Sequence, residues 1–198
     1  MDHEAASRTS PSLSPGQERL VIAVDRAIYH IARRWLWVAN GIAALLVGIP
    51  ILAPYLMATG HQQAALWIYR TFHLICSQIP SHSFFLFGYQ MGICERDTAI
   101  YSGTLILGLG YGMFGRRVRP LQWRYAFLLS VPMAIDGFSE LFGWRQTTWE
   151  LRVLTGSLFA MAVVWLTYPM LRIGFEGIER TLRLRFQRLA AEGRARAL

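Results

Sequence analysis

The sequence predicts an all-α integral membrane protein, a bundle of about four transmembrane helices with amphipathic helices at its ends. The chain of 198 residues is 54% hydrophobic and only 16% charged, whereas soluble domains carry about 25% charged residues. Its apolar residues form long runs that are flanked by arginine, as is typical of membrane spans. The net charge of +8 therefore indicates cytoplasmic flanks of spans, and we expect no nucleic-acid partner.

The N-terminal segment predicts a tail followed by a surface helix. Residues 1–17 are polar, with Ser, Pro and Gly, which favours a disordered cytoplasmic tail over a signal peptide. Apolar residues then recur at helical spacing, at Leu20, Val24, Ile28 and Ile31. With arginines between them, they predict an amphipathic helix on the inner membrane surface, at the start of a membrane domain over 18–171.

Four spans are predicted within that domain. They cover about residues 35–57, 98–114, 123–142 and 151–171. The first contains Pro50 and Pro54, which a span tolerates when neighbouring groups bond to the carbonyls that proline frees. The second has a flank of small residues, which predicts close approach of helix backbones. These residues are Gly103, Gly108, Gly110 and Gly112.

The segment after the first span is apolar but unusual. Residues 64–76 include Arg70 and His73, and the run is short for a complete span. We expect an extracytoplasmic re-entrant or interfacial segment, broken at Pro80 and followed by an aromatic run over 84–87 that dips into the headgroup zone. A full fifth span is the alternative interpretation.

The C-terminal segment, residues 172–198, predicts a basic amphipathic helix. Its apolar residues recur every three or four positions and its arginines lie between them, so we expect it to bind anionic lipids of the inner leaflet. Arginine is abundant at both ends of the chain and between the second and third spans. This distribution predicts a multi-pass protein of the plasma membrane with both termini in the cytoplasm.

In this topology, polar residues of three spans meet at the extracytoplasmic face. Asp136 and Glu140 are four residues apart and share a helix face. An ionisable residue within a span indicates a functional site with a charged partner, which for Asp136 would be Arg96 or Arg152. The candidate catalytic residues are Asp136, Glu140, Arg96, Arg145, Arg152 and Tyr101. The carboxylates would be base or ligand, and the arginines would hold an anionic group. The alternative is a structural Asp136–Arg152 ion pair.

The two cysteines allow three interpretations. A Cys76–Cys94 disulfide would staple the outer loop, since an extracytoplasmic compartment permits it. His73 and Cys76 are three residues apart, as are Cys94 and Asp97. These four residues would make a tetrahedral zinc site, in which His82 competes for the role of histidine ligand. Unpaired thiols without a role are the third interpretation.

Two sequence blocks resemble a known family. The first block runs from Cys76-Ser77-Gln78-Ile79-Pro80 to Cys94-Glu95-Arg96-Asp97 and Ile100-Tyr101-Ser102-Gly103, and the second includes Asp136-Gly137, Glu140, Gly143, Arg145, Arg152, Thr155 and Gly156. Together they resemble uncharacterised prokaryotic membrane proteins that are catalogued as a domain of unknown function. The resemblance spans about residues 70–171, implies a polytopic membrane protein and supplies no reaction.

Three positions depart from the pattern of that family. Ser77, Asp97 and Glu140 stand where the family often has His, Cys and Gln, so a C-x-x-C dithiol mechanism is not available. The first hypothesis is a membrane enzyme, metal-dependent in one version, that acts on a lipid or a small anionic ligand. The second hypothesis is a non-catalytic assembly or partner-binding protein whose polar cluster is structural. A second copy of the chain, in a homo-oligomer, is one partner that we consider. A transporter is a weaker third hypothesis.

Overall fold

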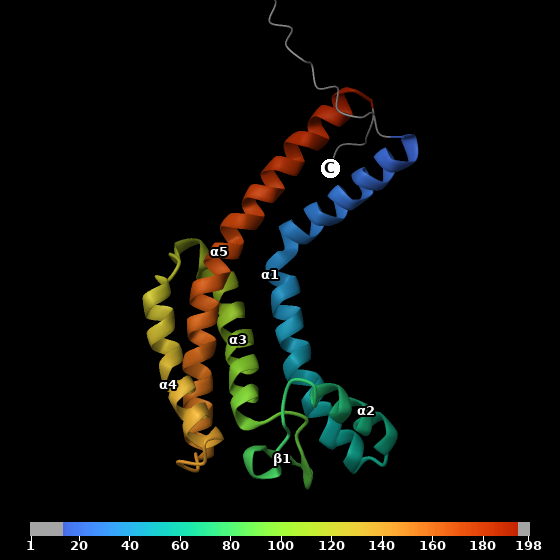
Figure 1. Ribbon diagram of the computed structural model, residues 1–198. Coiled ribbons are helices and arrows are strands. Elements are labelled where there is room, and N and C mark those ends of the chain that lie inside the picture. Colours follow the sequence, from blue (N-terminus) through green and yellow to red (C-terminus); the bar gives the residue numbers. More distant parts are fainter. Residues whose placement is uncertain (1–13, 194–198) are drawn as a thin grey trace, which may run out of the picture. The chain divides into compact units, whose positions relative to one another are not determined.

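The computed structural model describes residues 14–193, and it is mostly helical (Figure 1). The elements in chain order are α1 (Pro15–Ala58), α2 (Gln62–Phe72), η1 (Pro80–His82), β1 (Phe85–Leu86), β2 (Tyr89–Gln90), α3 (Glu95–Phe114), η2 (Gly115–Arg117), α4 (Trp123–Leu141) and α5 (Trp149–Ala191). The chain divides into two compact units. Of the described residues, the first unit comprises 14–34 with 175–193 and the second comprises 35–174, and α1 and α5 contribute to both.

In the first unit, the first half of α1 packs against the last half of α5. Tyr29 of α1 is buried with Leu182 and Phe186 of α5, and Asp25 forms an ion pair with Arg185. Part of the apolar face predicted over 172–198 therefore contacts protein. A disordered tail was predicted over residues 1–17. Its first 13 residues lie outside the described residues, and its last three belong to α1, which begins at Pro15.

Two of the described helices are long and apolar enough to cross a membrane, α1 over Gly16–Ala58 and α5 over Trp149–Ala191. Only 22% and 28% of the two apolar windows are buried within the described structure, whereas the core helix of a soluble protein is mostly buried. Helices α3 and α4 coincide with the predicted segments 98–114 and 123–142. The predicted boundaries at 35 and 171 are not helix ends, because α1 and α5 run through them.

Two prolines inside the long helices free carbonyl groups that loops then bind. Pro54 has no N–H for the carbonyl of Pro50, and the N–H of Gly92 donates to this carbonyl at 3.2 Å. Pro169 likewise leaves the carbonyl of Trp165 without its helical donor, and the N–H of Leu121 donates to it at 3.2 Å. Each proline thus anchors a connecting loop to a long helix.

Small residues bring α3 close to its neighbours. A Cβ atom added at Gly108 would lie 2.1 Å from Oδ1 of Asn40 in α1, and one added at Gly103 would lie 2.9 Å from Cβ of Ala160 in α5. From the other side, a Cβ atom at Gly156 would lie 2.8 Å from the carbonyl oxygen of Arg96. Close approach is therefore confirmed at Gly103 and Gly108, whereas Gly110 faces open space.

The segment over 64–87 forms no long helix. Helix α2 ends at Phe72, which makes it shorter than a membrane span. The aromatic run over 84–87 enters a hairpin, in which Leu86 of β1 pairs with Tyr89 of β2. Phe87 and Gly88 form its two-residue turn with φ of 55° and 81°, as a type I′ turn requires. Buried Phe72, Cys76, Met91 and Ile93 form the apolar cluster beneath the hairpin.

We predict that Gly156→Ala destabilises the second unit, because the new methyl group would overlap the backbone of α3. Overpacking of this kind typically costs about 1–3 kcal/mol. Thermal unfolding of the detergent-solubilised protein, followed by circular dichroism, measures the effect. Gly110→Ala is the matched control because nothing lies within 4 Å of its added Cβ atom. Equal melting temperatures for the two variants would contradict the packing described here.

Candidate functional site: a thiol–carboxylate cluster beside an ion-pair network

The loop that carries Cys76 is held by amide side chains. The Gln78 side-chain amide donates to the carbonyls of Tyr69 and Gly92 at 2.8 and 2.9 Å. The Gln90 side-chain amide donates in turn to the carbonyl of Gln78 at 2.6 Å. The Tyr69 hydroxyl donates to the carbonyl of Gln90 at 2.5 Å. These bonds fix the Cys76 loop and the hairpin against α2.

Cys76, Cys94 and Asp97 lie together at the start of α3. One donor atom from each, the two Sγ atoms and a carboxylate oxygen, lies within 4.8 Å of the other two. The backbone N–H of Cys94 donates to Sγ of Cys76, and the thiol of Cys94 donates to Oδ2 of Asp97, both at 3.2 Å. Both cysteines are unbonded thiols in the structure, so the predicted Cys76–Cys94 disulfide is not formed there.

The two thiols of this cluster differ in acidity. The neighbouring Cys94 side chain lowers the pKa of the Cys76 thiol, although burial and Asp97 act against this. The neighbouring Cys76 side chain, burial and the charge of Asp97 all raise the pKa of the Cys94 thiol. A thiolate is the form of cysteine that binds metal ions.

An ion-pair network lies beside the thiols and begins at Asp136 of α4. Asp136 is 1% exposed, and each of its carboxylate oxygens accepts from one arginine. Nη2 of Arg96 in α3 lies 2.6 Å from Oδ2, and Nη2 of Arg145 lies 2.6 Å from Oδ1. Since a buried carboxylate needs such partners, Asp136 joins the start of α3 to the loop that follows α4.

Glu140 and Arg152 extend the network to α5. Oε1 of Glu140 lies 2.6 Å from Nη2 of Arg152 and 3.3 Å from Nε2 of His82. Oε2 of Glu140 lies 3.2 Å from Nη2 of Arg96. Arg152 is 4% exposed and also pairs with buried Glu95, at 2.9 Å. Three guanidinium groups thus face three carboxylates, and their formal charges cancel.

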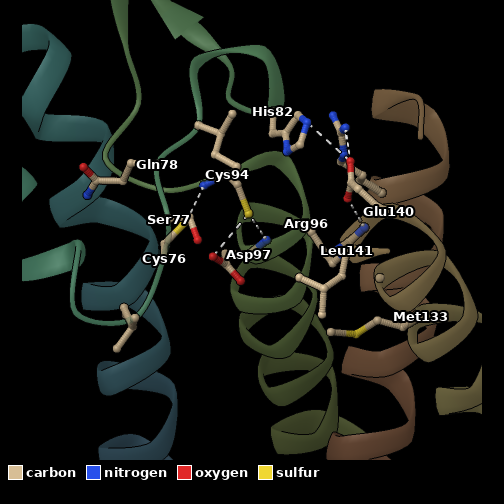
Figure 2. Close-up of a pocket in the computed structure, with 14 residues that line it drawn as sticks. Cys76, Ser77, Gln78, His82, Cys94, Arg96, Asp97, Met133, Glu140 and Leu141 are labelled. Carbon is tan, nitrogen blue, oxygen red and sulfur yellow. Dashed lines mark hydrogen bonds and ion pairs between the residues drawn. The ribbon is translucent and has the colours of Figure 1, made fainter. Parts of the chain in front are cut away.

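One cavity of about 520 Å³ opens between these two groups of residues. Cys76, Cys94 and Asp97 line it on one side, and Arg96 and Glu140 lie on the other (Figure 2). Arg152 and His82 also contribute to its wall. An ion or small molecule in this cavity would therefore meet thiols, carboxylates and guanidinium groups together.

The structure brings together most, but not all, of the predicted site residues. Asp136, Glu140, Arg96, Arg145 and Arg152 form the ion-pair network, and Cys76, Cys94 and Asp97 form the thiol–carboxylate cluster. Tyr101 instead packs against the apolar cluster around Phe72. His73 is exposed at the end of α2 and lies outside the thiol–carboxylate cluster.

Some residues of the site were not predicted in their observed roles. Arg152 pairs with Glu140 and Glu95, and Asp136 takes Arg96 and Arg145, so Asp136–Arg152 is not among the ion pairs of the described residues. Glu95 was absent from the candidates although it directly precedes Arg96 in the sequence. The one feature of the sequence that could have indicated Glu95 as a site residue is its position next to Arg96.

We predict that Asp136→Asn strongly destabilises the protein, because it leaves Arg96 and Arg145 without their shared charged partner. Breaking a buried ion pair from one side typically costs about 3–5 kcal/mol. Reversible unfolding in mixed detergent micelles measures this loss of free energy. The control is Glu179→Gln, which removes an exposed i,i+4 pair with Arg183 and should leave stability unchanged within error. Asp136→Asn with wild-type stability would contradict the prediction.

Comparison with known proteins gives relatives without an assigned activity. Residues 76–166 match the model of a family described as "Predicted membrane protein (DUF2085)". An uncharacterized protein of Methanocaldococcus jannaschii is 34% identical over 128 residues, which are 60% of this chain and 81% of the relative. An uncharacterized protein of Methanothermobacter thermautotrophicus is 33% identical over 85 residues, which are 43% of this chain and 77% of the relative. No solved structure matches.

Proposed function

The chain belongs to the DUF2085 family of predicted membrane proteins, and from this premise we propose a multi-pass protein with a metal-binding site at its extracytoplasmic face. Four spans are supported by the two long apolar helices together with α3 and α4, which have 20 and 19 residues. The arginine-rich loop before α4 and the arginines of both terminal segments support cytoplasmic termini. The cavity then opens outside the cell.

We predict opposite labelling at the two ends of the bundle. In a Cys76→Ser, Cys94→Ser background, Thr59→Cys after α1 should react with a membrane-impermeant maleimide on intact cells. Gln122→Cys before α4 should react only after the membrane is permeabilised. Both positions are exposed, so each is chemically available. The reverse pattern would place the cavity in the cytoplasm and contradict the proposed orientation.

A divalent ion of the zinc type is the metal that suits the cluster. The metal proposal rests on one observation, which is that donor atoms of Cys76, Cys94 and Asp97 lie within 4.8 Å of one another in the wall of a cavity. Thiolate and carboxylate are both zinc ligands, at about 2.0–2.3 Å. Three protein ligands are typical of zinc sites that keep one position for water or substrate, and here that position would face the cavity.

The residues across the cavity support an activity on an anionic ligand. Arg96 and Arg152 line the cavity, and guanidinium groups are suited to carboxylate and phosphate oxygens. The metal-bound position and these arginines would then hold the same ligand from two sides. In this proposal the protein is a metal-dependent membrane enzyme whose reaction class is set by that anionic group.

A structural role for the ion-pair network is the second candidate, and it has its own supporting observation. Each carboxylate of Glu95, Asp136 and Glu140 already has an arginine partner. A network balanced in this way can fix the register of α3, α4 and α5 with no ligand at all. The protein would then be an assembly or partner-binding protein of the membrane.

The first unit supports a second contact with the membrane, at the inner leaflet. Leu20, Val24 and Ile28 are 65%, 48% and 40% exposed along one stripe of α1, and arginines lie between them in the sequence. This combination suits the surface of anionic lipids. We therefore retain the inner leaflet as a proposed partner of both terminal segments.

We predict that the purified wild-type protein binds one Zn²⁺ and that Cys94→Ser abolishes this binding. Serine caps helices well, so α3 should form while the metal ligand is lost. His73→Ala is the matched control and should bind normally, since His73 lies outside the thiol–carboxylate cluster. Elemental analysis after desalting measures the metal content. At 100 times its Kd, Zn²⁺ should also stabilise the wild type by about 2.7 kcal/mol.

Two outcomes would contradict the metal proposal. One is a wild-type protein that folds normally, contains no metal and is not stabilised by added Zn²⁺. The other is equal metal content in wild type and Cys94→Ser. In either case the structural role of the polar residues would be favoured.

A further inference from the structure

The cavity has a polar interior and an apolar rim. Arg96, Arg152 and Glu140 supply charged groups to its wall. Ile75, Ile79 and Leu141 line the same cavity, yet they are 55%, 43% and 75% exposed. A residue that both lines a cavity and stays exposed lies at its mouth. The cavity therefore joins a charged interior to an exposed apolar surface.

Two arginines that line the cavity, Arg96 and Arg152, each have a buried N–H without an acceptor among the described residues. Within the described part of the chain, Nε of Arg96 and Nε of Arg152 are buried and donate to no acceptor. The side chain of Arg152 is only 5% exposed, so leaving its N–H unbonded is costly. Oxygen atoms of a phosphate group are strong acceptors for guanidinium donors of this kind.

The rim suits a hydrocarbon chain. Leu141 and Met133 of α4 line the same cavity as Arg96, and Ile75 and Ile79 come from the loop after α2. An acyl chain that covered these side chains would remove their apolar surface from water. A small hydrophilic anion would leave that surface exposed.

We propose that the ligand of this cavity is a phospholipid, with its phosphate-bearing headgroup at Arg96 and Arg152 and its acyl chain over Ile75, Ile79 and Leu141. This inference rests on the proposed function because it names the ligand class of the same cavity. It does not depend on the metal, since the two arginines and the rim are separate from Cys76, Cys94 and Asp97.

Three probes separate headgroup from acyl chain. Full-length protein, delipidated in dodecyl maltoside micelles that contain no phosphate, is titrated with dihexanoyl phosphatidate, with inorganic phosphate and with dihexanoylglycerol. We expect the phosphatidate to bind at least about tenfold more tightly than either half-molecule, because it alone uses both parts of the cavity. If inorganic phosphate or dihexanoylglycerol bound as tightly as the phosphatidate, the proposal would be overturned.

Substitutions at the rim test the site of binding. Ile75→Ser should weaken phosphatidate binding by at least about fivefold, because it removes apolar contact at the rim. Leu74→Ser is the matched control, since Leu74 is the adjacent residue and 85% exposed but does not line the cavity. It should leave the Kd within about twofold. Equal weakening by both variants, or by neither, would contradict binding at this rim.

Metal content separates this test from that of the proposed function. Ile75→Ser should bind Zn²⁺ like the wild type, because Ile75 contributes no ligand atom to the thiol–carboxylate cluster. Normal metal content with no preference for phosphatidate would overturn the lipid inference alone. Tight phosphatidate binding by a metal-free wild type would support the lipid inference while removing the metal proposal.

Discussion

The need to neutralise Asp136 governs the arrangement of the second unit. A carboxylate with 1% exposure is tolerated only with charged partners close by, and these come from α3 and from the loop after α4. Arg96 also reaches Glu140, which in turn holds Arg152 of α5. One buried charge thereby sets the relative depth of three helices, and the cavity lies where their polar ends meet.

Proline and glycine then position the loop that closes this site. The carbonyl that Pro54 frees in α1 binds the N–H of Gly92, and a Cβ atom at Gly92 would lie 3.2 Å from Cα of Pro50. This contact fixes the chain two residues before Cys94. Gln78 binds the carbonyl of the same glycine, and so the loop with Cys76 is drawn to the start of α3.

Hydropathy and spacing predicted the helices and the acidic pair of α4, since both depend on local periodicity. The arginine partners of Asp136 could not be predicted, because the rotation of each helix about its own axis decides which arginine lies near Asp136. His73 lies outside the group of Cys76, Cys94 and Asp97 for a local reason. The spacing of His73 and Cys76 suits one helix face, but α2 ends at Phe72. The pairing of the terminal helices was missed because an amphipathic face is equally suited to lipid and to another helix.

The first turn of α3 explains how thiols and ion pairs share one cavity without interfering. Cys94 caps the helix, and its Sγ accepts from the N–H of Asp97 at 3.5 Å, where the positive end of the helix dipole favours anionic groups. Arg96 lies between them in sequence and its guanidinium points to Asp136. Successive residues of a helix face different directions, so a single turn presents a thiol and a carboxylate to one wall and a guanidinium to the other. One short segment therefore contributes to both groups of residues, and its placement depends on the buried charge of α4.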